Sequence, residues 1–158
     1  MTANRTIVLR AGDARDIDLV DPLMEAAFEP RFGEAWTRGQ CLGVMAMPGV
    51  RLTLALVDDQ PAGFAMVRTV ADEAELLLLA VAPSCRRRGV GAALLRSVIE
   101  AARSAGVADL HLEVRANNDA VRLYLGSGFR KVGERRGYYR GKTGQQFDAH
   151  TYRLAVPA

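Results

Sequence analysis

The sequence predicts one α/β domain in which helices cover a mixed sheet. The chain of 158 residues has the length of an ordinary single domain, and 49% hydrophobic with 25% charged residues is the balance of a globular protein. Helical and strand-like apolar periodicities alternate along the chain. A buried strand near the middle runs through a glycine-containing loop directly into a helix. We therefore expect a layered fold with a strand, a loop and a helix at its centre.

In the first half of the chain, apolar periodicity and turn residues predict a strand, two helices and two more strands. Asp13 and Asp16 follow a first strand over 6–10 and can cap a helix. A second helix is expected to start near Trp36 and to end before Pro48. An antiparallel meander of two strands then follows. The apolar residues of the first helix are Ile17, Val20, Leu23, Met24 and Phe28, and the meander strands cover 52–57 and 62–70 around a turn at 58–61.

The second half is expected to hold the central strand and the helix that follows it. Residues 75–82 are apolar on both faces, as in a strand covered on each side, and Pro83 ends this strand. From Gly89 to about Ser104 apolar residues recur at helical spacing, and Gly106 closes the helix. The remaining expected elements are a strand over 108–114, a short helix over 117–127, and a last pair of strands from 129 onward joined through 141–144.

Charge and cysteine usage limit the classes of function. The net charge of +3 comes from arginine, since Lys131 and Lys142 are the only lysines. Arginine favours planar contacts to phosphate or carboxylate, so a polyanionic small molecule fits and nucleic acid is not required. Cys41 and Cys85 lie far apart and only two histidines are present, so we expect neither a metal nor a disulfide. No apolar run could span a bilayer and residues 1–5 lack an apolar signal segment, so we expect a cytoplasmic protein without a membrane partner.

The loop Arg86-Arg87-Arg88-Gly89-Val90-Gly91 has the features of an anion site at a helix N-terminus. The first amides of a helix lack internal partners and carry partial positive charge. Gly89 and Gly91 remove side chains where a phosphate would touch the backbone. Each arginine opposes the helix dipole by about 0.3–1 kcal/mol, so three together indicate an anion between them and the helix. A diphosphate would serve, and a solvated run of surface charge is the alternative.

A series of motifs around this loop resembles the acetyl-CoA motifs of the GNAT superfamily of N-acetyltransferases. The motifs are, in order, Leu79-Ala80-Val81-Ala82-Pro83, Arg86-x-x-Gly89-x-Gly91-Ala92-x-Leu94-Leu95, Leu112-Glu113-Val114-Arg115, Asn117-x-x-Ala120-x-x-Leu123-Tyr124, and Gly128-Phe129 with Gly133. The match covers roughly residues 50–155. The resemblance implies one domain over 1–158, with a mixed sheet of about seven strands and about four helices. It also implies an acyltransferase that uses acetyl-CoA as co-substrate and needs no metal.

The resemblance also assigns roles to residues. The fourth strand would hydrogen-bond the pantetheine arm, the loop amides would hold the pyrophosphate, and an asparagine would lie near the cofactor. The cofactor-binding residues so implied are Leu79, Ala80, Val81, Arg86, Arg87, Arg88, Gly89, Val90, Gly91, Ala92 and Asn117. Glu113 aligns with the group that takes the proton of the amine, and Tyr124 with the group that assists the departing thiolate. Glu113 and Asn117 are four residues apart where five are usual, and a motif on Asn118 would instead shorten the helix before Tyr124.

The acceptor is indicated by the stretch Arg135-Arg136-Gly137-Tyr138-Tyr139. It resembles the Arg-x-x-Tyr-Tyr stretch of the ribosomal-protein alanine N-acetyltransferase (RimI) branch, in which the tyrosine pair helps to form the slot for a protein N-terminus. The resemblance implies acetylation of the α-amine of a ribosomal protein, with Tyr138 and Tyr139 contacting that substrate. An acetyltransferase for a small amine or amino acid, and a non-enzymatic acyl-CoA-binding module, are the alternatives. The sequence does not indicate whether the protein is a monomer or a homodimer.

Overall fold

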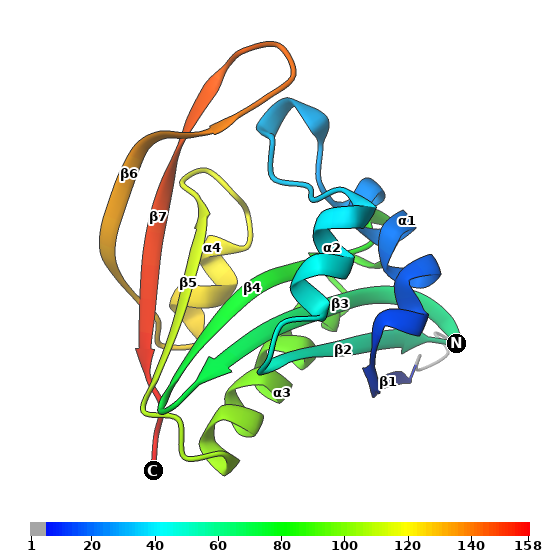
Figure 1. Ribbon diagram of the computed structural model, residues 1–158, viewed down its shortest axis with the longest axis vertical. Helices are drawn as coiled ribbons and strands as arrows, with labels where there is room; N and C mark the ends of the chain where they lie inside the picture. The colour runs from blue at the N-terminus through cyan, green and yellow to red at the C-terminus, as the bar shows by residue number, and fades with distance from the viewer. Residues whose placement is uncertain (1–5) are drawn as a thin grey trace.

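A mixed sheet of seven strands forms the centre of the protein in the order β1-β2-β3-β4-β5-β7-β6 (Figure 1). The computed structural model describes residues 6–158, so the expectation about a signal segment in residues 1–5 lies outside the described range. The described neighbours in the sheet are antiparallel, apart from the parallel pair β4 and β5. The strands are β1 (Ile7–Gly12), β2 (Val50–Val57), β3 (Gln60–Val70), β4 (Glu73–Val81), β5 (Asp109–Arg115), β6 (Arg130–Arg140) and β7 (Gln146–Ala155).

Helices cover both faces of the sheet (Figure 1). On one face, α1 and α2 pack against inward-facing residues of β2, β3 and β4, with Phe64 and Met66 fully buried at the centre. On the other face, α3 and α4 form a second core around Leu94 and Leu110. The helices are α1 (Ile17–Ala27), α2 (Arg38–Met45), α3 (Val90–Ser104) and α4 (Val121–Gly126). The predicted α/β class, with about seven strands and four helices, is confirmed.

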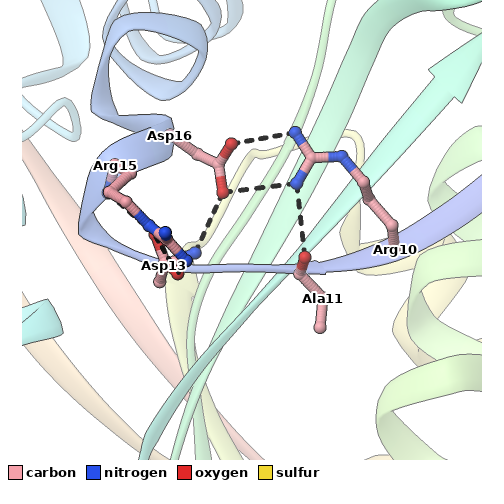
Figure 2. Close-up of polar contacts among 5 residues, drawn as sticks. All are labelled: Arg10, Ala11, Asp13, Arg15 and Asp16. Carbon is pink, nitrogen blue, oxygen red and sulfur yellow. Dashed lines mark hydrogen bonds and ion pairs between the residues drawn. The ribbon is translucent and has the colours of Figure 1, made fainter.

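The start of α1 is fixed by the two aspartates that the sequence marks as caps (Figure 2). Asp13 accepts from the backbone N–H of Arg15 at 2.9 Å, and Asp16 accepts from the backbone N–H of Asp13 at 3.0 Å. This reciprocal capping box satisfies orphan amides of a 3-10 turn that leads directly into the helix. Arg10 of β1 adds a two-pronged contact to Asp16, at 2.8 and 3.3 Å. The capping residues therefore also join the helix to the edge strand.

The cap of α1 gives stability a dependence on pH. The Arg15 side chain, and then its backbone N–H, lower the pKa of Asp13 from 3.8 to about 2. The unfolded chain thus binds more protons than the folded chain between these values, so the contribution of the charge is complete above the unfolded pKa and is lost as pH falls through the folded one. We expect Asp13→Asn, which still caps, to lower the melting temperature near neutral pH. The difference from wild type should vanish in acid, and a difference independent of pH in thermal melts would contradict this origin.

The short helix expected over 117–127 begins later than predicted. Asn118 forms a local turn, in which its side-chain oxygen accepts from the backbone N–H of Ala120 at 2.8 Å and its own N–H donates to the carbonyl of Arg115 at 3.0 Å. Asparagine side chains compete in this way with helical hydrogen bonds. The helix α4 therefore starts at Val121, and the prediction of helix over 117–120 is wrong.

Candidate active site

A cavity lies where β4 and β5 part from one another. The two parallel strands are paired from Glu73–Asp109 to Leu76–Leu112 and no further, although both continue beyond that point. The register of β3 against β4 shifts at this place, which leaves Leu77 as an extra residue in β4. Such a bulge bends its strand. The resulting gap holds a cavity of about 190 Å³, lined by Glu75–Leu79 of β4 and Leu112–Val114 of β5.

Glycine is required at two positions of the arginine-rich loop for different structural reasons. Gly89 is the N-cap of α3 and has φ of +82°, a left-handed conformation that glycine adopts without strain. Gly91 lies in the first turn of α3, where a Cβ atom would stand 3.3 Å from Leu123 and 3.6 Å from Val81. The absence of a side chain at Gly91 therefore lets α3 approach both α4 and the end of β4. Arg87 also has a left-handed backbone, with φ of +64°.

The predicted cofactor residues occupy distinct positions around this loop. Leu79 lines the cavity, whereas Ala80 and Val90 turn their side chains into the core. Arg86 donates to the carbonyl of Ala27 at 2.8 Å, which ties the loop to the end of α1, where a cation suits the helix dipole. The exposed residues of the loop are Arg86, Arg87, Arg88 and Gly89, and Ala92 is half-buried on α3. A role of these residues in binding acetyl-CoA stays a prediction.

The two predicted catalytic residues face the same cavity. Glu113 projects from β5, and its Oε2 lies 3.5 Å from the hydroxyl of Thr151 and 3.3 Å from Nε of Arg135. Tyr124 reaches the cavity from α4, with only 4% of the residue exposed. Burial, and then the negative charge of Glu34, raise the pKa of the Tyr124 hydroxyl above its usual value. The hydroxyl therefore remains protonated at neutral pH and is available as a donor.

The tyrosine pair lies at the same cavity. Tyr138 and Tyr139 both line it, and their rings meet edge to face with centroids 5.1 Å apart. Tyr138 is half exposed, and the guanidinium of Arg135 lies 5.1 Å from its ring centroid. Tyr139 points inward, and burial followed by the charges of Glu34 and Glu113 raises the pKa of its hydroxyl. The geometry thus brings both predicted substrate contacts beside both predicted catalytic residues, and their roles stay predictions.

Asn117 and Asn118 are adjacent in the sequence, but their side chains have different surroundings. Asn118 lines the cavity, while Asn117 is exposed and accepts a hydrogen bond from Arg115. The side-chain amide of Asn118 also donates to Glu34 at 3.0 Å. The asparagine directed toward the cavity is therefore the second of the pair. The assignment of Asn117 to the cofactor remains a prediction.

Glu34 also lines the cavity, and no motif in the sequence indicates it. Glu34 lies in the loop between α1 and α2, and its Oε1 stands 2.9 Å from Nε of Arg115. Both side chains are only 8% exposed. A glutamate in a loop without periodicity has no local signature, so sequence reasoning missed it. A usable signal was Arg115 itself, because an arginine in a buried strand requires an anionic partner from elsewhere in the chain.

Among the described residues, neither a membrane-spanning helix nor a cluster of potential metal ligands is present. No helix within 6–158 is long and apolar enough to cross a bilayer. The same residues contain no group of three or more histidine, cysteine or acidic side chains arranged to hold a metal.

Comparison with known proteins identifies the class. Residues 18–129 match the sequence model described as the acetyltransferase (GNAT) family. This chain therefore belongs to the GNAT family of acetyltransferases.

Particular relatives share the central part of the sequence. The chain is 46% identical over 83 residues to the ribosomal protein bS18-alanine N-acetyltransferase of Salmonella typhimurium. The aligned segment covers 52% of this chain and 56% of the relative. For the corresponding Escherichia coli K12 protein the identity is 44% over 86 residues, covering 54% and 58%. The chain thus spans a little over half the length of these curated relatives.

Solved structures extend the similarity across the fold. The crystal structure of the ribosomal-protein-S18-alanine N-acetyltransferase from E. coli matches with a TM-score of 0.86 and 29% identity, covering 97% of this chain and 96% of that one. Ard1 from Thermoplasma volcanium matches with a TM-score of 0.80 and 25% identity, covering 96% and 99%.

Proposed function

We propose that this protein transfers the acetyl group of acetyl-CoA to the N-terminal α-amine of a protein. The observation that carries the proposal is the convergence of Glu113, Tyr124 and the pair Tyr138 and Tyr139 on one cavity where β4 and β5 part. The relatives named above act on an alanine of ribosomal protein bS18, which supports a ribosomal protein that begins with alanine as the acceptor.

The surroundings of the cavity fit acetyl-CoA as the co-substrate. The N-terminus of α3 offers amides to a diphosphate beside a left-handed Gly89 and the exposed Arg87 and Arg88. Beyond Leu76, the edge of β4 that faced β5 is free of strand pairing, so its backbone groups are available to the amides of the pantetheine arm. When bound, acetyl-CoA would supply the acetyl group as a thioester.

The chemistry is direct attack of the amine on the thioester carbonyl. The nitrogen forms a bond to the carbonyl carbon, the carbon–sulfur bond breaks, the sulfur leaves as a thiolate, and Glu113 takes the proton of the amine through water. An α-amine with a pKa of about 7.7–8.0 costs about 1 kcal/mol to neutralise near pH 7, against about 4.6 kcal/mol for lysine. Tyr124 stabilises the thiolate by donating a hydrogen bond, since its raised pKa opposes full proton transfer.

The acceptor class is tested by measuring release of the CoA thiol with a short peptide that begins with alanine. We expect turnover on this peptide and none on the same peptide with a blocked N-terminus. Turnover only on small amines or free amino acids would establish the alternative acceptor class. Binding of acetyl-CoA without turnover on any amine would mark a non-enzymatic acyl-CoA-binding module.

The pH dependence separates an α-amine from a lysine acceptor. Only the neutral amine attacks, so at subsaturating peptide kcat/KM should rise with pH and level off near the α-amine pKa of about 8. A peptide carrying an unblocked lysine and a blocked N-terminus serves as the control. A rate that continues to rise toward about pH 10 would indicate a lysine acceptor instead.

A further inference from the structure

We propose that Glu34 is a positioning residue, and that its buried pair with Arg115 is a latch that holds the α1–α2 loop over the acceptor side of the cavity. The loop is residues 28–37, and the acceptor latch comprises Glu34, Arg115 and Asn118. The part of the proposal that concerns the acceptor peptide rests on the proposed function. The latch itself concerns the structure of the loop and can be measured without turnover.

The contacts of Glu34 use both of its carboxylate oxygens. Oε1 accepts from Nε of Arg115 at 2.9 Å, and Oε2 accepts from the side-chain amide of Asn118 at 3.0 Å. The guanidinium of Arg115 also donates to Asn117 and lies 3.5 Å from the ring centroid of Phe32. One arginine thus binds two residues of the loop and the turn that follows β5. Because both charges are buried, removing either would leave the other without a counter-charge.

A second set of contacts presses the same loop against the hairpin of β6 and β7. A Cβ atom on Gly141 would lie 1.7 Å from the carbonyl oxygen of Arg31, and one on Gly33 would lie 2.1 Å from that of Arg140. The backbones therefore touch at places that only glycine permits. The rings of Phe32 and Phe147 add an edge contact, with centroids 5.0 Å apart. Figure 1 shows the loop after α1 extending toward the tip of this hairpin.

The latch therefore joins the α1–α2 loop to the end of β5 and to the turn after it, at the cavity that the tyrosine pair also lines. Glu34 lines the cavity together with Asn118, Tyr124 and Tyr139. With both oxygens engaged as acceptors, Glu34 orients its neighbours and does not take the proton of the amine. Glu113 differs, because its contacts to Arg135 and Thr151 are longer, and Arg135 is largely exposed.

The test compares Glu34→Gln with Glu29→Gln, a matched change at an exposed position of the preceding turn. Glu34→Gln should raise the KM for an alanine-starting peptide about tenfold and leave the KM for acetyl-CoA within about twofold. The pH profile of kcat/KM should keep its wild-type shape, because the base is intact. Hydrogen–deuterium exchange over residues 28–37 should accelerate. Glu34→Asp, which keeps the charge, should be intermediate, and Glu29→Gln should match wild type.

Each contrary outcome has a defined meaning. An unchanged peptide KM together with unchanged exchange in the loop would overturn the latch. A rise of both KM values in step would also overturn it, because the effect would then be general destabilisation. If the wild-type enzyme acetylates no peptide, the proposed function fails, and the exchange of residues 28–37 in Glu34→Gln alone decides whether the latch exists.

Discussion

Glu113→Gln should lower kcat for acetylation of an alanine-starting peptide about a hundredfold or more, with the Kd for acetyl-CoA within about twofold of wild type. Glutamine keeps the size of the side chain and can still meet Thr151 and Arg135, but it cannot take the proton of the amine. The deficit should persist as pH rises through the α-amine pKa of about 8, because the neutral amine that attacks the thioester must still lose a proton. Stopped-time assays of CoA release over this pH range measure the effect.

Glu73→Gln is the matched control for this prediction. Glu73 is an exposed glutamate on β4, and it lies outside the cavity. The Glu73→Gln variant should retain wild-type kcat and KM. An activity of Glu113→Gln close to that of Glu73→Gln would remove Glu113 from the mechanism. Weaker binding of acetyl-CoA by Glu113→Gln would instead assign it a structural role at the cavity.

Gly89→Asp should weaken acetyl-CoA binding roughly thirtyfold relative to Gly89→Asn, which corresponds to about 2 kcal/mol. Both side chains tolerate the left-handed backbone at this position better than other residues do. Both also find space, because the nearest atom to a Cβ here is Cδ1 of Ile7 at 3.9 Å. The two variants therefore differ mainly in one negative charge at the N-terminus of α3, where the diphosphate is proposed to bind.

Titration calorimetry with acetyl-CoA measures this second prediction. The difference in acetyl-CoA affinity between the two variants should become smaller at high salt, because ions screen the repulsion between the aspartate and the diphosphate. Melting temperatures of the variants should be similar, since an aspartate is also favourable at a helix N-terminus. Equal affinities of Gly89→Asp and Gly89→Asn would place the diphosphate away from this helix.

Local rules explain which parts of the fold could be predicted. Asp13 and Asp16 predict the start of a helix. The apolar run of β4, followed by Pro83 and Gly89, predicts a strand, a loop and a helix. These features depend on residues that are close in the sequence, so sequence patterns are enough to predict them. The error at α4 is also local, since Asn118 offers a turn that competes with the helix and that periodicity does not reveal.

The remaining features depend on residues far apart in the chain. Glu34 acquires its place from Arg115, 81 residues away, and no motif around Glu34 indicates this pairing. Gly141 could be assigned to a turn from sequence, but its contact with the backbone at Arg31 exists only in the folded chain. The parting of β4 and β5 likewise depends on the bulge at Leu77, which the register of β3 creates. Family motifs gave the catalytic candidates, and the long-range contacts define the acceptor side.

Tandem mass spectrometry of a peptide product tests the central claim most directly. The peptide begins with alanine, contains one internal lysine, and is incubated with acetyl-CoA and the wild-type protein. We predict a single acetyl group on the α-amine of the alanine, and strongly reduced product with Glu113→Gln. An unmodified peptide, or an acetyl group on the lysine side chain, would contradict transfer to a protein N-terminus at this cavity.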